Sequence, residues 1–176
     1  MRNPQLEFMA PFKGAEQTVN LIRKYALEAQ YDPTVRLFVE QIVGEISSKD
    51  YLSEIFAIYF YVLSHTRYMN DPRTIELVRR PQVVLQEIQE GKIPCLDCDD
   101  ITTLLLAMYL TCGREVRIAT VAFRHTFVGK ERQYSHVFPQ VKEPKTSRWI
   151  VTDPVAAEDT NQMMNKVVAT KIWSVA

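Results

Sequence analysis

Residues 95–113 read CLDCDDITTLLLAMYLTCG, and this stretch predicts the clearest helix of the chain. Asp99 and Asp100 suit the N-terminal end of a helix, where the helix dipole favours negative charge. Apolar residues then recur at helical spacing until Gly113 closes the run; they are Ile101, Leu104, Leu105, Met108 and Tyr109. We therefore predict a helix that begins at Cys98 and buries an apolar face.

Four further helical segments are predicted around this stretch. Periodic apolar residues favour a first helix over 15–30, and Asp32-Pro33 then supplies an N-cap and a proline at the first position of a second helix. A third helix, over 49–65, is apolar nearly all round, so we expect it at the centre of the fold. A short helix over 82–90 ends at Gly91.

The pattern changes to period two after Arg114, where one set of residues (Val116, Ile118, Thr120 and Ala122) alternates with a second set (Arg117, Ala119, Val121 and Phe123). Further strands are expected over 134–141, 148–152 and 167–173. Pro139 removes a ladder donor from the first of these, which predicts an edge strand or a bulge. Helices followed by strands indicate an α+β fold, with an antiparallel sheet packed on the helix of Cys98.

Composition limits the classes of function. The 176 residues are 47% hydrophobic and 24% charged, which suits one domain, and 21 basic residues balance 21 acidic ones. No global field therefore favours nucleic acid or an anionic membrane. The longest apolar run, 55–63, is too short to span a bilayer, and the first residues do not resemble a signal peptide. Three cysteines favour a reducing compartment, so we expect cytoplasmic localisation.

Three residues of the predicted core have the chemistry of a catalytic triad. Cys98 opens a helix, whereas His136 and Asp153 lie on two consecutive predicted strands. A thiol needs a neighbouring imidazole to become a thiolate, and the imidazole needs an acceptor that fixes its tautomer. Adjacent antiparallel strands bring facing side chains within about 5 Å. We therefore expect His136 to contact both Cys98 and Asp153, and Cys98 to be the one thiol with a low pKa.

Each residue also has a structural interpretation. Cys98 alone is typical of a small buried residue, a lone histidine on a strand is usually structural, and Asp99 and Asp100 alone indicate capping. Cys95-x-x-Cys98 permits a zinc or redox module. However, Cys112, His125 and His136 are scattered, and no βαβ unit precedes the pair. We expect neither a metal nor a cofactor.

The order and spacing of several motifs resemble the transglutaminase-like cysteine peptidase superfamily, in its compact bacterial and bacteriophage form. The motifs are Tyr68-x-x-Asp71-Pro72, Glu76-Leu77-Val78-x-x-Pro81, Cys98-Asp99-Asp100, Ser135-His136-Val137 and Trp149-x-x-x-Asp153-Pro154. The resemblance implies one papain-like domain over 1–176, with a helical N-terminal part (1–66) and a catalytic core (67–176). One departure is Leu96, which stands where members commonly have glycine, so substrate access to Cys98 is expected to differ.

The resemblance implies a cysteine-dependent acyl-transfer enzyme that acts on an amide of a peptide or protein. Cys98 is then the nucleophile, His136 the general base and later acid, and Asp153 the group that orients His136. The backbone of Cys98 and the side chain of Tyr68 are candidate oxyanion donors. Peptidase, amidase and transglutaminase chemistry remain open, and the charged residues Glu76, Arg79 and Arg80 form either a substrate rim or a solvated charge run.

An alternative is a non-catalytic interaction protein of a phage or prophage that keeps the fold for virion assembly. Its partner is then a virion or host protein, and its location is the virion or the infected cell. The sequence leaves the oligomeric state open. Fold-level analogy alone does not decide between the two functions.

Overall fold

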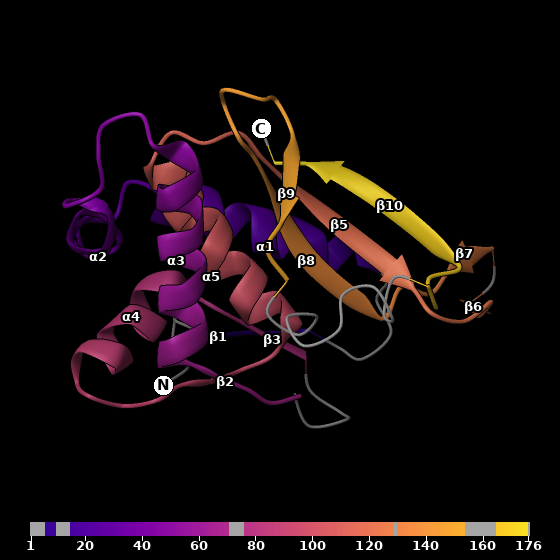
Figure 1. Cartoon of the computed structure of the whole chain (residues 1–176). Coiled ribbons are helices and arrows are strands. Elements are labelled where there is room, and N and C mark those ends of the chain that lie inside the picture. The colour runs from indigo at the N-terminus through magenta and orange to yellow at the C-terminus, as the bar shows by residue number, and fades with distance from the viewer. Residues whose placement is uncertain (1–5, 10–14, 71–75, 129, 154–164, 176) are drawn as a thin grey trace.

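The computed structural model describes residues 6–9, 15–70, 76–128, 130–153 and 165–175. It confirms the α+β architecture, with the five described helices before the main antiparallel sheet in the sequence (Figure 1). The helices are α1 (Ala15–Ala29), α2 (Pro33–Val43), α3 (Tyr51–His65), α4 (Pro81–Gln89) and α5 (Cys98–Thr111). The strands are β1 (Leu6–Met9), β2 (Arg67–Tyr68), β3 (Glu76–Arg79), β4 (Cys95–Leu96), β5 (Val116–Ala122), β6 (Phe127–Val128), β7 (Glu131–Arg132), β8 (His136–Lys142), β9 (Trp149–Val151) and β10 (Ala169–Ser174).

The main sheet has four strands in the order β10-β5-β8-β9, and every pair in it is antiparallel. Its members correspond to the four strands predicted from the sequence. Three two-stranded pairs, β1-β3, β2-β4 and β6-β7, were not predicted. The β2-β4 pair is parallel and sets Tyr68 beside Leu96, just before the helix of Cys98.

Local sequence signals account for most helix ends. Asp32 caps α2 by accepting a hydrogen bond from the Thr34 N–H at 2.8 Å, and Pro33 occupies the first turn. Gly91 follows α4 with φ of 76°, a conformation that glycine adopts without strain. None of the helices in the described part of the chain combines the length and the apolar character needed to cross a bilayer.

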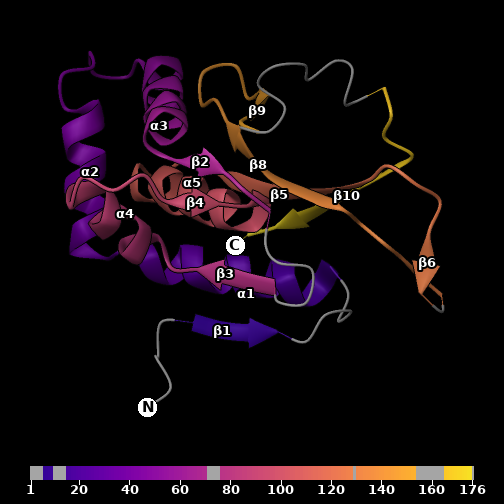
Figure 2. The same ribbon diagram turned by 90° about the horizontal axis from the view of Figure 1, so that it is seen from below.

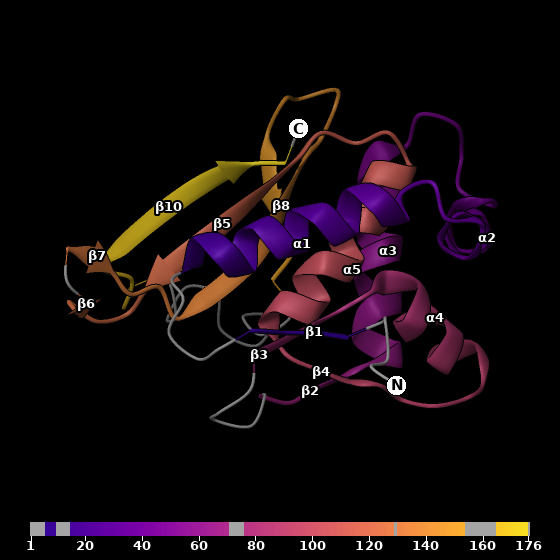
Figure 3. The same cartoon turned by 180° about the vertical axis from the view of Figure 1, so that it is seen from behind.

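Helix α5 is the central element. It lies between α1 and α3 (Figures 1 and 3), and its residues 99–109 are all buried. The Tyr109 hydroxyl donates to the Ile55 carbonyl of α3 at 3.3 Å, and the Thr111 hydroxyl donates to the Gln30 carbonyl, just after α1, at 3.2 Å. Because α5 also packs against β8, it joins the N-terminal helices to the sheet.

The prediction that α3 lies at the centre is wrong. Only Ile55, Ile58 and Val62 of this helix are buried, and Phe60 is 59% exposed. Phe56 is also exposed, and its ring stacks on that of Phe60 at a centroid distance of 6.1 Å. The sheet and α1 surround α5, so α3 covers α5 from outside and keeps an apolar face toward solvent.

Pro139 lies on neither an edge strand nor a bulge, so that prediction is also wrong. Strand β8 lies between β5 and β9, and its register with β5 is unbroken from Val116↔Val141 to Val121↔His136. The ladder with β9 ends at Gln140↔Val151, and the Pro139 carbonyl on that side accepts from the Thr152 N–H at 3.3 Å. A central strand accommodates proline here because its missing N–H lies where the neighbouring ladder has stopped.

Candidate active site

The N-terminus of α5 is fixed by an aspartate that precedes Cys98. Asp97 Oδ1 accepts hydrogen bonds from the N–H groups of Asp99 and Asp100, at 3.1 and 3.2 Å. Capping by an aspartate satisfies N–H groups that have no partner inside the helix. The cap thus makes Cys98 the first residue of the helix and uses N–H groups other than that of Cys98.

The first turn of α5 contacts strand β8 at the residue that follows His136. The backbone N–H of Val137 hydrogen-bonds the Cys98 sulfur, and the Thr102 hydroxyl, one turn further on, donates to the Val137 carbonyl at 3.3 Å. The half-buried Cys98 side chain also packs against the main core. Cys98 and His136 are therefore held on two elements that are tied together at Val137.

The imidazole of His136 and the carboxylate of Asp153 form a short, buried pair. His136 Nε2 lies 2.6 Å from Asp153 Oδ2, and the two residues are 7% and 3% exposed. An ionised carboxylate only accepts hydrogen bonds, so in the neutral imidazole Nε2 carries the proton and Nδ1 keeps its lone pair. The ring is stacked with that of Phe123 at a centroid distance of 6.4 Å. This tautomer leaves Nδ1 as the atom that can accept a proton.

Tyr68 lies in the same region. Its pKa is raised to about 12 by burial and by the charges of Cys98, Asp97 and Asp153. The ring is nevertheless 40% exposed, and its hydroxyl donates to Asn70 Oδ1 at 2.8 Å. A tyrosine with a high pKa stays protonated at neutral pH, so this hydroxyl remains a hydrogen-bond donor.

The structure thus brings His136 and Asp153 into direct contact and places Cys98 and Tyr68 close by. The Cys98 sulfur contacts the backbone N–H of Val137 and lies 3.9 Å from Asp99 Oδ1. Among the described residues, the structure shows no hydrogen bond between Cys98 and His136. The catalytic roles of Cys98, His136 and Asp153, and the oxyanion role of Tyr68, stay predictions.

The expectation of a low pKa for Cys98 is wrong for this arrangement. Burial raises the pKa of the thiol well above its usual value, and the negative charges of Asp99 and Asp97 raise it further. The Val137 N–H acts in the opposite direction but does not outweigh them. The thiol at rest is therefore neutral near pH 7, and its ionisation requires a base.

We predict the pH dependence of Cys98 alkylation from this direction. Because the raised pKa keeps the thiol protonated, the rate of labelling by iodoacetamide should rise steadily from pH 7 to pH 10. The measurement uses a Cys95→Ala, Cys112→Ala double variant, so that Cys98 alone is labelled. A rate that has already reached its plateau at pH 6 would show instead a preformed thiolate.

The remaining sequence candidates lie apart from this cluster. Cys95 is exposed on β4, and Cys112 follows the far end of α5, where burial raises its pKa to about 11. His65 interacts with the Tyr61 carbonyl at 2.8 Å, and His125 approaches Arg132 at 3.4 Å. In the described ranges, no group of three His, Cys, Asp or Glu side chains converges as metal ligands do.

The other sequence features have structural partners. Arg79 pairs with Glu87 at 2.7 Å and Arg80 with Glu28 at 2.6 Å, so neither arginine belongs to a freely solvated charge run. Leu96, the departure from the family pattern, is 1% exposed and packs into the core. Its side chain is thus directed into the protein and does not cover Cys98 from the solvent side.

Three residues near the site were not predicted from the sequence: Thr102, Val137 and Tyr59. Thr102 lies one helical turn after Cys98, and that spacing is the signal by which it could have been found. Val137 acts through its backbone, and a backbone contact has no side-chain signature. The hydroxyl of Tyr59 donates to the Asp153 carbonyl at 3.0 Å. Tyr59 belongs to a strongly apolar helix, so the sequence pattern indicated only burial for it.

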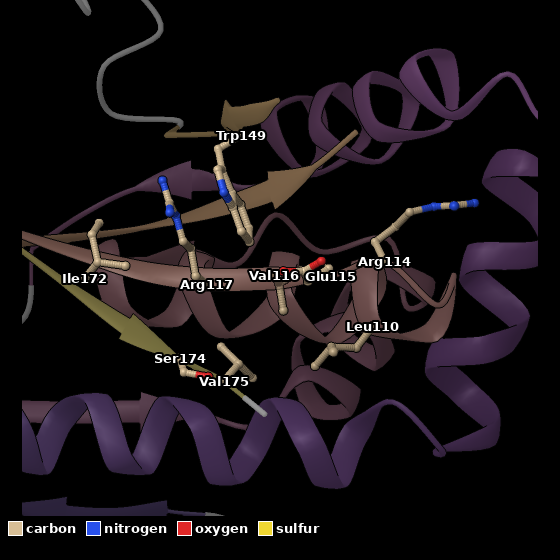
Figure 4. Close-up of a pocket in the computed structure, with 9 residues that line it drawn as sticks. All are labelled: Leu110, Arg114, Glu115, Val116, Arg117, Trp149, Ile172, Ser174 and Val175. Carbon is tan, nitrogen blue, oxygen red and sulfur yellow. The ribbon is translucent and has the colours of Figure 1, made fainter. Parts of the chain in front are cut away.

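A cavity of about 300 Å³ lies at the opposite end of α5 (Figure 4). The Arg117 guanidinium stacks on the Trp149 ring there, at 4.0 Å from its centroid, and Leu110 of α5 contributes to the lining. Cys98 begins the same 14-residue helix, which is about 20 Å long. The cavity is therefore separate from the candidate active site.

Comparison with solved structures finds chains that resemble this one. A candidate protease from Parabacteroides distasonis is 12% identical with a TM-score of 0.59, and the match covers 93% of this chain and 30% of that one. A candidate cysteine protease from Cytophaga hutchinsonii is 14% identical with a TM-score of 0.48, covering 96% of this chain and 58% of that one. The chain thus spans less than two thirds of either protein.

The match to a family model includes the residues of the candidate site. No curated protein matches the sequence. The model of the transglutaminase-like superfamily matches residues 38–154, a range that contains Tyr68, Cys98, His136 and Asp153. Because this match covers more than half of the sequence, the chain belongs to the transglutaminase-like superfamily.

Proposed function

We propose that the chain is a cysteine-dependent acyl-transfer enzyme that acts on an amide or peptide bond. The observation that carries the proposal is the 2.6 Å contact between the buried His136 imidazole and the Asp153 carboxylate. This pair lies next to Val137, whose N–H contacts the sulfur of Cys98. An oriented imidazole beside a thiol at a helix N-terminus is the arrangement that nucleophilic cysteine chemistry requires.

In the proposed first step, His136 acts as a general base. Its Nδ1 takes the thiol proton while the Cys98 sulfur attacks the acyl carbon, and the carbonyl electrons move onto oxygen. The resulting imidazolium is stabilised by Asp153. The raised pKa of the thiol fits a proton transfer that occurs during attack and not before it. We expect the sulfur and the ring to be within about 3–4 Å when substrate is bound.

The oxyanion that forms needs hydrogen-bond donors. The Cys98 N–H, at the positive end of α5, is one candidate, and the Tyr68 hydroxyl is the other. Tyr68 donates to Asn70 in the resting structure, so the hydroxyl has to turn toward the substrate.

Collapse of the tetrahedral intermediate completes the transfer. The C–N bond breaks, the leaving amine takes the proton from His136, and the acyl group remains on sulfur as a thioester. Water or a second amine then attacks the thioester, and His136 again acts as the base. Hydrolysis gives a peptidase or amidase, whereas attack by an amine gives a transglutaminase.

Detection of the thioester tests this function. The protein is incubated with a mixture of peptide amides and activated esters, quenched in acid, and analysed by intact mass and peptide mapping. We expect one acyl group on Cys98, and its loss should be faster when a primary amine is added if transfer is the reaction. Acylation of Cys95 or Cys112 in place of Cys98 would contradict the proposal.

A further inference from the structure

Asp153 lies beyond the end of its own strand. The last β8-β9 pair is Gln140↔Val151, two residues before Asp153. Thr152 is held by bonds from its N–H and its hydroxyl to the Pro139 carbonyl, at 3.3 and 3.5 Å. Asp153 therefore follows the last β8-β9 pair of the described ranges.

Tyr59 of α3 supplies a bond at this point. Its hydroxyl donates to the Asp153 backbone carbonyl at 3.0 Å, and α3 stands beside the β9 end of the sheet in two views (Figures 1 and 2). Burial, together with the charge of Asp153, raises the pKa of Tyr59, so its hydroxyl keeps its proton. The Tyr109 side chain of α5 lies close to the Thr152 side chain, so two helices contact the short segment that carries Asp153.

We propose that Tyr59 is a positioning residue for the acyl-transfer reaction. By holding the main chain at Asp153, it keeps Oδ2 in hydrogen-bond reach of His136 Nε2. The inference rests on the proposed function, in which Asp153 orients the base. A short bond between two buried groups tolerates little displacement, and misplacement of a catalytic group by about 1 Å lowers a rate by as much as about 10²-fold.

The test is Tyr59→Phe, which removes the hydroxyl and keeps the ring. The matched control is Tyr61→Phe, the same change on the same helix in a half-buried tyrosine whose ring packs edge-on against Phe38. We expect Tyr59→Phe to lower kcat by about tenfold, with KM within about twofold, because substrate contacts are unchanged. Tyr61→Phe should change neither constant.

Two readouts separate positioning from a general structural effect. A looser carboxylate forms a longer hydrogen bond, so Tyr59→Phe should move the NMR signal of the His136 Nε2 proton upfield of its position in the wild-type protein. In a Asp153→Ala background, Tyr59→Phe should cause no further loss, because the group that it positions is gone.

The NMR measurement needs no turnover, so it distinguishes failure of this inference from failure of the proposed function. If the wild-type protein shows no Cys98-dependent turnover but Tyr59→Phe still moves the His136 Nε2 proton signal upfield, the positioning role is supported and the proposed reaction is not. An unchanged Nε2 proton signal in Tyr59→Phe overturns the inference. Equal effects of Tyr61→Phe, or an additive loss in the Asp153→Ala background, overturn it as well.

Discussion

Replacing Cys98 with alanine is expected to abolish amide turnover, with a fall in kcat/KM of at least about 10³-fold. The sulfur is the atom that bonds to the acyl carbon in the proposed reaction, and no other group of the site can form the thioester. The change removes one atom from a half-buried side chain at the first position of α5, while Asp97 still caps the helix. The melting temperature should therefore stay close to that of the wild-type protein.

The matched controls are Cys95→Ala and Cys112→Ala. Cys95 lies exposed on β4 and Cys112 at the far end of α5, so each variant should keep full activity. The measurement is the rate of release of a labelled amine from a panel of peptide amides. Unchanged turnover in Cys98→Ala would sink the assignment, and the same lack of turnover in wild type and variant would favour the non-catalytic alternative.

Replacing Asp153 with alanine is expected to lower kcat/KM by about 10²-fold or more. His136 then loses the acceptor of its Nε2 proton, which lies in a buried site, so the ring is free to adopt the wrong tautomer or orientation. The unpaired N–H should also cost about 1–3 kcal/mol in the free energy of unfolding, measured by urea denaturation.

Asp153→Asn gives a graded comparison. The amide oxygen of asparagine accepts the Nε2 proton but brings no charge to stabilise the imidazolium, so its activity should lie between that of Asp153→Ala and wild type. Equal activity of the two variants would mean that charge, and not orientation, is the contribution of Asp153. Full activity of Asp153→Ala would remove Asp153 from the mechanism.

Much of the fold followed from local patterns. Some signals act over a few residues and can be read directly from the sequence. They are the cap and proline of α2, the glycine after α4 and the apolar spacing of α5. The sheet strands were also found by their alternation. The two-residue strands β2 and β4 were not, because they are defined only by each other across more than 25 residues of chain.

The position of a helix in the core is a different kind of property. Both α3 and α5 are strongly apolar, yet α5 is buried along 99–109 and α3 exposes Phe60. Hydrophobicity gives the tendency to be buried, whereas the packing of the sheet and α1 decides which helix is surrounded. Pro139 was misjudged for a similar reason, since the end of the β9 ladder cannot be read from β8 alone.

For the candidate site, the sequence was a better guide to the contact between His136 and Asp153 than to the pKa of Cys98. The proximity of His136 and Asp153 was anticipated from two consecutive strands. The pKa of Cys98 was not, because the helix dipole lowers it while burial and two carboxylates raise it, and only the three-dimensional environment shows which effect is larger. Tyr59 depends on a contact between residues 94 positions apart, which no local motif encodes.

The placement of α5 also bears on how the chain folds during synthesis. The helix lies in the middle of the sequence. The elements that pack against it are α1 and α3, which are synthesised before it, and β8, which is synthesised after it. A nascent chain that has released α5 but not β8 leaves the sheet-facing apolar side of that helix open to water. The segments 1–66 and 67–176 therefore cannot each bury their apolar surface alone, and we expect the core to close only after β8 has left the ribosome.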